Sequence, residues 1–307
     1  SAEDADSEGE EGKFYLFSSS EIRNLLDKET ADVVVRWFGV LSEGNYEDES
    51  HGRRTGLNIL HEGISIDSIS AQTGLKKEDI EKRLVLASKT LFQTREERIG
   101  PLLDDKVLTD WNGLMIAALA KAGRVLEEPK FIDMAIKAQR FIQDNLTNQD
   151  GRLLHRYRDG EAGIQAYLDD YAFTVFGLIE LYQSTFDTDY LQKALHLNSI
   201  MIDLFIDKEG GGFFLSSKDS AATLVRPKDL YDGAIPSGNS VAFYNLVRLS
   251  RITGTTALFE EAVVAARSFQ HEVARNASGH SFFLMALNFA LGPSVEIVIA
   301  GDAESTD

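Results

Sequence analysis

The chain has 307 residues, of which 43% are hydrophobic, and its formal net charge at pH 7 is −18. A globular chain of this length buries about 75% of the surface that its unfolded form exposes, so a large core is expected. The acidic charge argues against a nucleic-acid partner, and the absence of cysteine excludes disulfides, thiolate zinc sites and a Cys-x-x-Cys redox centre in this chain.

No apolar run is long enough to cross a membrane, and the chain does not open with the basic and then apolar segment of a secretory signal. The lack of cysteine also fits a reducing compartment. We therefore expect a cytoplasmic protein with no membrane partner.

The first twelve residues carry six acidic side chains, and we expect them to be solvated and flexible. Residues 4–9 resemble the beginning of a calcium loop, but Tyr15 stands where that loop needs a bidentate glutamate. A P-loop, a G-x-G-x-x-G motif and an H-E-x-x-H motif are also missing from the sequence. We therefore expect neither a metal nor a cofactor.

Further along the chain, Ser18 and Glu21 form a capping box, which predicts that a helix begins there. Residues 69–84 then resemble a helix-turn-helix motif. A DNA-binding motif needs a basic recognition helix, whereas this second helix mixes lysine and arginine with glutamate and aspartate. We interpret residues 62–98 as a structural helical insert.

A repeated pattern follows the insert, in three segments that align without gaps. The two anchors of each segment are Asn112 and Phe131, Tyr171 and Tyr190, and Asn239 and Leu258. Each segment predicts an inner helix that is apolar almost all round, as in residues 114–119, and an outer helix that is amphipathic, as in residues 131–142.

A turn-rich stretch follows each outer helix, at residues 148–151, 207–212 and 276–279, and leads into aromatic and aliphatic residues. These patterns together predict an all-α fold. We expect an incomplete (α/α)6 toroid of helical hairpins with short β-hairpin-like crossings, in which residues 1–307 form a single fragment of roughly three and a half hairpins.

Four ordered blocks resemble the signature blocks of one family. They lie at residues 4–15, 104–113, 168–172 and 232–240. The chain is similar, over essentially its whole length, to bacterial thioredoxin-domain proteins related to the spermatogenesis-associated thioredoxin-like protein.

In that family a thioredoxin-like domain precedes an (α/α)6 barrel similar to N-acylglucosamine 2-epimerases and six-hairpin glycosidases. The resemblance implies that this chain is the central part of the barrel, without the thioredoxin-like domain and the first barrel helices. The thioredoxin-like domain is then an expected partner in the full-length protein. Unpaired apolar helices in such a fragment would favour self-association.

The starts of the inner helices carry the candidate site residues. Equivalent positions in a ring face the same mouth, so their polar side chains should converge on one cavity. Helix capping also explains one such residue per helix, but it does not explain two adjacent aspartates. The three blocks are Asp110-Trp111-Asn112, Asp169-Asp170-Tyr171 and Ser237-Gly238-Asn239.

Acids, amides and aromatic rings suit a carbohydrate, because carboxylates accept hydrogen bonds from hydroxyls and rings cover the apolar face of a sugar. The alternative is that Trp111 and Tyr171 are core aromatics. The predicted acid–base residues are Asp105, His155, Asp169 and Asp170. The predicted ligand-binding residues are Asp110, Trp111, Asn112, Arg156, Tyr171, Asp232, Ser237 and Asn239.

Two functions remain open from the sequence. The first is binding of, or action on, a small carbohydrate at the mouth of the ring, which the resemblance implies through the fold alone. The second is a non-catalytic scaffold or binding domain attached to a thioredoxin-like domain with a redox-regulatory role. An enzyme needs at least one acid–base group with a shifted pKa, and a scaffold does not.

Overall fold

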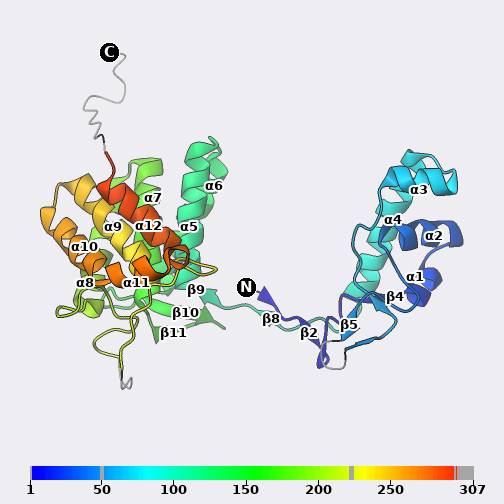
Figure 1. The fold of residues 1–307 in the computed structure, drawn as a ribbon, viewed down its shortest axis with the longest axis horizontal. Coiled ribbons are helices and arrows are strands. Elements are labelled where there is room, and N and C mark those ends of the chain that lie inside the picture. Colours follow the sequence, from blue (N-terminus) through cyan, green and yellow to red (C-terminus); the bar gives the residue numbers. More distant parts are fainter. Residues whose placement is uncertain (1, 49–51, 221–224, 294, 296–307) are drawn as a thin grey trace, which may run out of the picture. The chain divides into compact units, whose positions relative to one another are not determined.

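The computed structural model describes residues 2–48, 52–220, 225–293 and 295, and it divides into two compact units, residues 1–105 and 106–307 (Figure 1). The predicted helical insert at residues 62–98 lies in the first unit. Whether the first unit belongs to the same toroid as the second stays a prediction.

The described residues of the first unit form four helices, which pack around a small apolar core, and several pairs of short strands. The core includes Ile22, Val34, Ile69 and Ile80, all fully buried. The helices are α1 (Ser19–Leu25), α2 (Lys28–Trp37), α3 (Ile66–Thr73) and α4 (Lys77–Glu96). The strand pairs are β1 (Ala2–Glu3) with β8 (Leu103–Asp104), β2 (Asp6–Ser7) with β3 (Glu10–Glu11), β4 (Phe17–Ser18) with β7 (Leu57–Asn58), and β5 (Glu47–Asp48) with β6 (Arg53–Arg54).

The second unit is built from successive helical hairpins, as the repeat predicted. The hairpins are α5 (Thr109–Val125) with α6 (Pro129–Asn145), α7 (Leu168–Thr185) with α8 (Thr188–Phe205), and α9 (Gly238–Thr253) with α10 (Thr256–Ser268). Two helices follow, α11 (Gln270–Arg275) and α12 (Ser281–Leu291), with a 3-10 helix over Ala277–His280 between them. The predicted all-α class and the hairpin arrangement of an (α/α) toroid are confirmed.

The inner helices α5, α7 and α9 pack side by side, and α12 packs against α9 (Figure 1). The middle helix α7 is buried along most of its length, because α5, α8 and α9 all cover it. The outer helix α8 buries one face at the spacing 194, 197, 201 and 204. This difference explains why only the outer helices are amphipathic.

The crossings differ from one another more than the sequence predicted. Among the described residues only the first is a β-hairpin, with β10 (Leu154–Arg158) and β11 (Glu161–Gln165) joined through Asp159 and Gly160, both at positive φ. This hairpin and β9 (Val107–Leu108) form a three-stranded antiparallel sheet in the order β11-β10-β9. The second crossing has a bridge between Ile206 and Phe213, and the third is the 3-10 helix.

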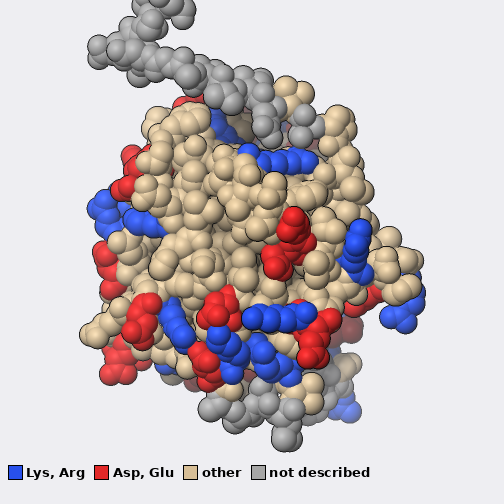
Figure 2. Space-filling model, turned by 90° about the vertical axis from the view of Figure 1, so that its left-hand side faces the viewer, with Lys and Arg blue, Asp and Glu red and all other residues tan. Residues whose placement is uncertain are grey.

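Charged side chains gather in the lower part of one face of the molecule, whereas its centre is mostly uncharged (Figure 2). Within the described parts of the chain, no helix combines the length and apolar composition that a membrane crossing requires.

Candidate acid–base site

Asp170 lies at the centre of the candidate site, in the first turn of α7, and is fully buried. The Asp110 backbone N–H donates to its Oδ1 (3.0 Å), and the Tyr167 backbone N–H donates to its Oδ2 (2.8 Å). Helix α5 has no capping side chain of its own, because its N-cap residue is Leu108. A carboxylate from the neighbouring helix therefore satisfies an N–H at the start of α5, where it also faces the positive end of the helix dipole.

His155 is held against this carboxylate by strand β10. Its Nδ1 lies 3.0 and 3.1 Å from the two oxygens of Asp170. The hydrogen bond to Asp170 raises the pKa of the imidazole, and the burial that opposes it has the smaller effect. With Nδ1–H donating to Asp170, Nε2 is left to give or take a proton.

Asp169 faces the opposite neighbour. A Cβ added at Gly238, the first residue of α9, would overlap its carboxylate, so only glycine permits this close approach. Burial, followed by the charges of Asp110, Asp170 and Asp229, raises the pKa of Asp169 to about 7, although a hydrogen bond from the Gly238 backbone lowers it. Near neutral pH this carboxyl can therefore donate or accept a proton.

Asp110 completes the cluster. Burial and the charge of Asp170 raise its pKa, while a hydrogen bond from the Trp111 backbone N–H (2.7 Å) lowers it. Ligand atoms of Asp110, His155 and Asp170 lie within 4.8 Å of one another and could hold a metal ion. Both oxygens of Asp170 already accept backbone N–H groups and face the imidazole, which favours proton transfer over metal ligation.

The remaining residues of the first two predicted blocks have other surroundings. The Trp111 side chain is 55% exposed and is available to a ligand, whereas the Asn112 side chain donates to the Leu108 carbonyl (2.8 Å). Tyr171 is buried in the core, and its hydroxyl accepts from the Leu153 backbone N–H (3.0 Å). Tyr171 is therefore a core aromatic and not a stacking surface for a ligand.

The polar side chains of the third block bind the backbone of the chain itself. The Ser237 side chain caps α9. The Asp232 carboxylate accepts a hydrogen bond from the Ser237 backbone N–H (2.9 Å) and from the backbone N–H groups of Phe282 and Phe283 at the start of α12. The Asn239 side chain bonds both the N–H (2.8 Å) and the carbonyl (2.9 Å) of Phe213. The polar groups of Asp232 and Asn239 are thus used to hold the second crossing and α12.

The two remaining predicted residues are Arg156 and Asp105. Arg156 follows His155 on β10, and because successive side chains of a strand point to opposite faces, it points away from the cluster. Asp105 is the last residue of the first unit, whereas the cluster belongs to the second, so its acid–base role stays a prediction.

Two neighbours of the cluster were not among the predicted site residues, although Gly238 lies inside the third predicted block. Tyr167 stacks edge-on against His155, with 5.3 Å between ring centroids, and Gly238 permits the approach of Asp169. Tyr167 also borders a cavity of about 310 Å³. This cavity is lined by Ile164, Gln165, Ala166, Tyr167, Ser216, Ser217, Asp219 and Ser220.

Two kinds of comparison place the chain among known proteins, while no protein-family model matches it. Spermatogenesis-associated protein 20 of Homo sapiens is 32% identical over 334 aligned residues, which cover the whole chain and 42% of that relative. The rat protein of the same name gives the same identity and coverage. An uncharacterized protein of Caenorhabditis elegans is 33% identical over 271 residues, which cover 81% of the chain and 37% of the relative.

Solved structures with a partial likeness are named as carbohydrate-active enzymes. Cellobiose 2-epimerase from Spirochaeta thermophila has a TM-score of 0.47 at 18% identity, covering 57% of the chain and 46% of that structure. An α-mannanase of glycoside hydrolase family 76 from Bacteroides thetaiotaomicron has a TM-score of 0.47 at 16% identity, covering 80% and 69%. On the sequence matches, the chain is homologous along its whole length to spermatogenesis-associated protein 20 and spans about two fifths (42%) of the length of that human relative.

Proposed function

We propose that Asp110, His155, Asp169 and Asp170 form an acid–base site that acts on a carbohydrate. The observation that carries the proposal is the buried Asp170 carboxylate, which orients His155 through Nδ1 while Asp169, beside it, has a pKa of about 7. A buried acid that orients a histidine, next to a second group that titrates near neutral pH, is typical of proton-transfer sites.

The chemistry assigns a different role to each group. Asp170 fixes the imidazole tautomer and stabilises the imidazolium, and it does not itself need to exchange a proton. His155 Nε2 and the Asp169 carboxyl are the two groups that exchange protons with a substrate. Asp110 contributes negative charge that keeps a proton on Asp169.

The surroundings favour a polyhydroxyl ligand. The cavity beside Tyr167 is lined by hydroxyl, amide and carboxylate side chains, which match the donors and acceptors of a sugar. The exposed ring of Trp111 offers an apolar surface for a sugar face. A polar cavity next to an acid–base pair is the arrangement that such an enzyme needs.

The test is a sugar-library screen with the whole chain. Saturation-transfer NMR detects binding, and NMR in D2O detects both a new reducing end and exchange of a carbon-bound proton. We expect Asp169→Asn and His155→Gln to bind the sugar but to lose turnover by at least about a hundredfold. The matched controls Asp133→Asn on α6 and His271→Gln on α11 should keep full turnover. An equal loss of turnover in the controls, or full turnover in both site variants, refutes the proposal.

A non-catalytic binding domain is the second candidate, because Asp232, Ser237 and Asn239 serve the fold alone. It predicts sugar or protein binding without turnover under every condition. A chelator tests for a metal site at Asp110, His155 and Asp170. Turnover that depends on a metal would be lost when the chelator is added, whereas a metal-free acid–base site would keep its turnover.

A further inference from the structure

The first unit contains a cavity of about 340 Å³ that has no part in the acid–base site. Its walls are mostly aromatic and aliphatic, and among the described lining residues the polar side-chain groups come from Ser88, Arg95 and the Tyr15 hydroxyl, which donates to Glu3 (2.7 Å). A mostly apolar cavity with few polar groups is the usual form of a small-molecule site. The lining residues are Tyr15, Leu16, Phe17, Phe38, Ile59, Leu60, Ser88, Leu91, Phe92 and Arg95.

Helix α4 supplies one wall of this aromatic cavity. Ser88, Leu91, Phe92 and Arg95 follow the spacing i, i+3, i+4 and i+7, which places them along one face of the helix. Seven residues of α-helix rise by about 10 Å. The cavity therefore has a hydroxyl at one end of this wall and a guanidinium at the other.

The charge of Arg95 is only weakly compensated. Its guanidinium lies 5.3, 5.5 and 5.0 Å from the ring centroids of Phe14, Tyr15 and Phe92. Its one ion pair within the described residues is a 3.4 Å contact with the adjacent and exposed Glu96, and its buried Nε has no hydrogen-bond partner there. A cation among rings whose carboxylate partner is a long contact to an exposed side chain favours an anionic ligand group.

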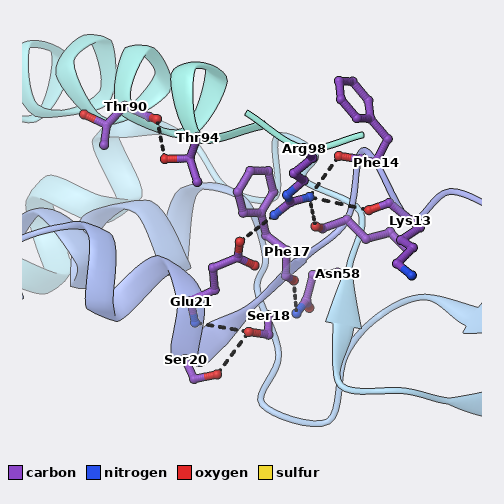
Figure 3. A network of polar contacts seen from close by, with 11 residues as sticks. Lys13, Phe14, Phe17, Ser18, Ser20, Glu21, Asn58, Thr90, Thr94 and Arg98 are labelled. Carbon is purple, nitrogen blue, oxygen red and sulfur yellow. Dashed lines mark hydrogen bonds and ion pairs between the residues drawn. The ribbon is translucent and has the colours of Figure 1, made fainter. Parts of the chain in front are cut away.

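A second arginine fixes the segment that carries two of the rings. Arg98 donates to the carbonyls of Phe14 (2.9 Å) and Leu16 (2.7 Å) and to Glu21 Oε1 (2.5 Å), and it lies over the Phe17 ring (Figure 3). These bonds hold residues 14–17 in place before any ligand arrives. Preorganised walls lower the entropy that binding costs.

We propose that this aromatic cavity binds a small monocarboxylate with a flat apolar body, whose carboxylate contacts Arg95 and whose body packs between Phe92, Phe17 and Ile59. A single lining cation matches a single negative charge. The proposal does not depend on the carbohydrate site, because all its residues lie in the first unit.

Isothermal titration calorimetry of the whole chain with 2-naphthoate tests the proposal, with 2-naphthalenemethanol as the neutral ligand of the same shape. We expect naphthoate to bind about tenfold more tightly than the alcohol, and acetate not to bind, since both the charge and the apolar body are needed. Equal affinity for naphthoate and the alcohol, or no binding of either, overturns the proposal.

Three variants assign the contacts. Arg95→Met keeps the apolar stem and should remove the preference for naphthoate, while Arg95→Lys should restore part of it. Phe92→Ala removes a partly exposed wall and should weaken both ligands, which keeps the test decisive if Arg95→Met fails to fold. Arg23→Met, an exposed arginine paired with Asp32, is the control and should change nothing; unchanged naphthoate binding in Arg95→Met and Phe92→Ala contradicts the site.

Discussion

At the scale of single residues, the adjacent carboxyls Asp169 and Asp170 have different surroundings because they face different inner helices. Asp170 accepts an N–H at the start of α5, and Asp169 lies against the start of α9. The sequence allowed two interpretations of this pair, helix capping and acid–base chemistry, and each of them applies to a different one of the two aspartates. Asp170 caps a neighbouring helix and orients His155, whereas Asp169 retains the perturbed pKa.

The raised pKa of Asp169 predicts a pH-dependent cost in stability. Between about pH 4 and about pH 7 the native state holds a proton that the unfolded state has lost, so the stability of the protein falls as the pH rises through this window. Asp169→Asn lacks this cost. We expect the variant to be more stable than the wild type by on the order of 2 kcal/mol at about pH 8, and equally stable at about pH 4.

Thermal melting across this pH range measures the difference, and Asp133→Asn on the exposed face of α6 is the control. If Asp169→Asn were less stable than the wild type at about pH 8, the ionised carboxylate would be contributing favourably to the fold. The site would then be a structural one.

His155 offers a second pH test. Its raised pKa means that the Asp170 contact stabilises the fold below the ordinary imidazole pKa of 6.5, and that this contribution is lost as the pH rises through the higher native value. Replacing the acceptor in Asp170→Asn should lower the pKa of His155, because the neutral amide no longer favours the imidazolium. Histidine NMR titration follows the shift, with His271 as the internal reference; an unchanged His155 pKa would show that Asp170 does not set it.

At the scale of elements, the packing of α5 against α7 depends on two glycines. A Cβ at Gly113 would lie 2.6 Å from the Phe173 carbonyl carbon, and one at Gly177 would lie 3.0 Å from the Gly113 oxygen. Their backbones meet because neither residue has a side chain. The close approach also brings the start of α5 to Asp170.

We expect Gly113→Ala to destabilise the protein by about 1–3 kcal/mol. The added methyl group overpacks the contact between the two helices, and this cost exceeds the gain in helix propensity from glycine to alanine. Lys121→Ala changes an exposed position on the same helix and should stay within about 0.5 kcal/mol of the wild type. Urea denaturation compares the two variants. A Gly113→Ala variant as stable as Lys121→Ala would mean that α5 and α7 can move apart without loss of stability.

A buried ion pair links the inner helices further along their length. Glu180 of α7 lies 3.2 Å from Arg124 of α5 and 2.8 Å from Arg248 of α9, and the side chains of Glu180 and Arg248 are each only 5% exposed. Glu180→Ala leaves Arg248 buried without its carboxylate, so we expect a loss of about 3–5 kcal/mol. Calorimetric unfolding measures this loss of stability. The control is Asp203→Ala, which removes the exposed ion pair between Asp203 and Lys218 and should cost less than about 1 kcal/mol. An equal loss in Glu180→Ala and Asp203→Ala would show that Glu180 does not link the helices.

At the scale of the whole molecule, the second unit exposes apolar side chains on its first inner helix. Trp111, Met115 and Val125 of α5 are each more than half exposed, and their spacing places them on one face. An inner helix of a toroid is expected to have neighbours on both sides. An exposed apolar face of this kind is where self-association of the chain would occur, and self-association stays a prediction.

We therefore expect the chain to associate as its concentration rises, and Met115→Lys to shift the equilibrium towards the monomer because a charge in the apolar contact must be desolvated. Light scattering coupled to size exclusion measures the mass. Val85→Lys changes an exposed apolar residue of the first unit and is the control. A monomeric wild type at high concentration would contradict the expectation.

The hairpins could be predicted from the sequence because their signal is local. The apolar periodicity of each helix and the equal spacing of its anchors depend only on the chain near that helix. The predicted inner-helix starts therefore lie within three residues of the starts of α5, α7 and α9. Residues 148–157 likewise predicted the first crossing, since turn residues precede an alternating strand.

The composition of the site depended on the tertiary structure. The repeat placed Tyr171 and Asn239 at equivalent positions, with Asp170 one residue before Tyr171, but their neighbours differ: Asp170 meets His155, Tyr171 enters the core, and Asn239 binds the second crossing. The sequence by itself thus determined where the inner helices begin and that their starts are polar. Which polar groups are left for chemistry was decided only by the packing of neighbouring helices and crossings, because a hydrogen bond to a distant backbone group has no local sequence signal.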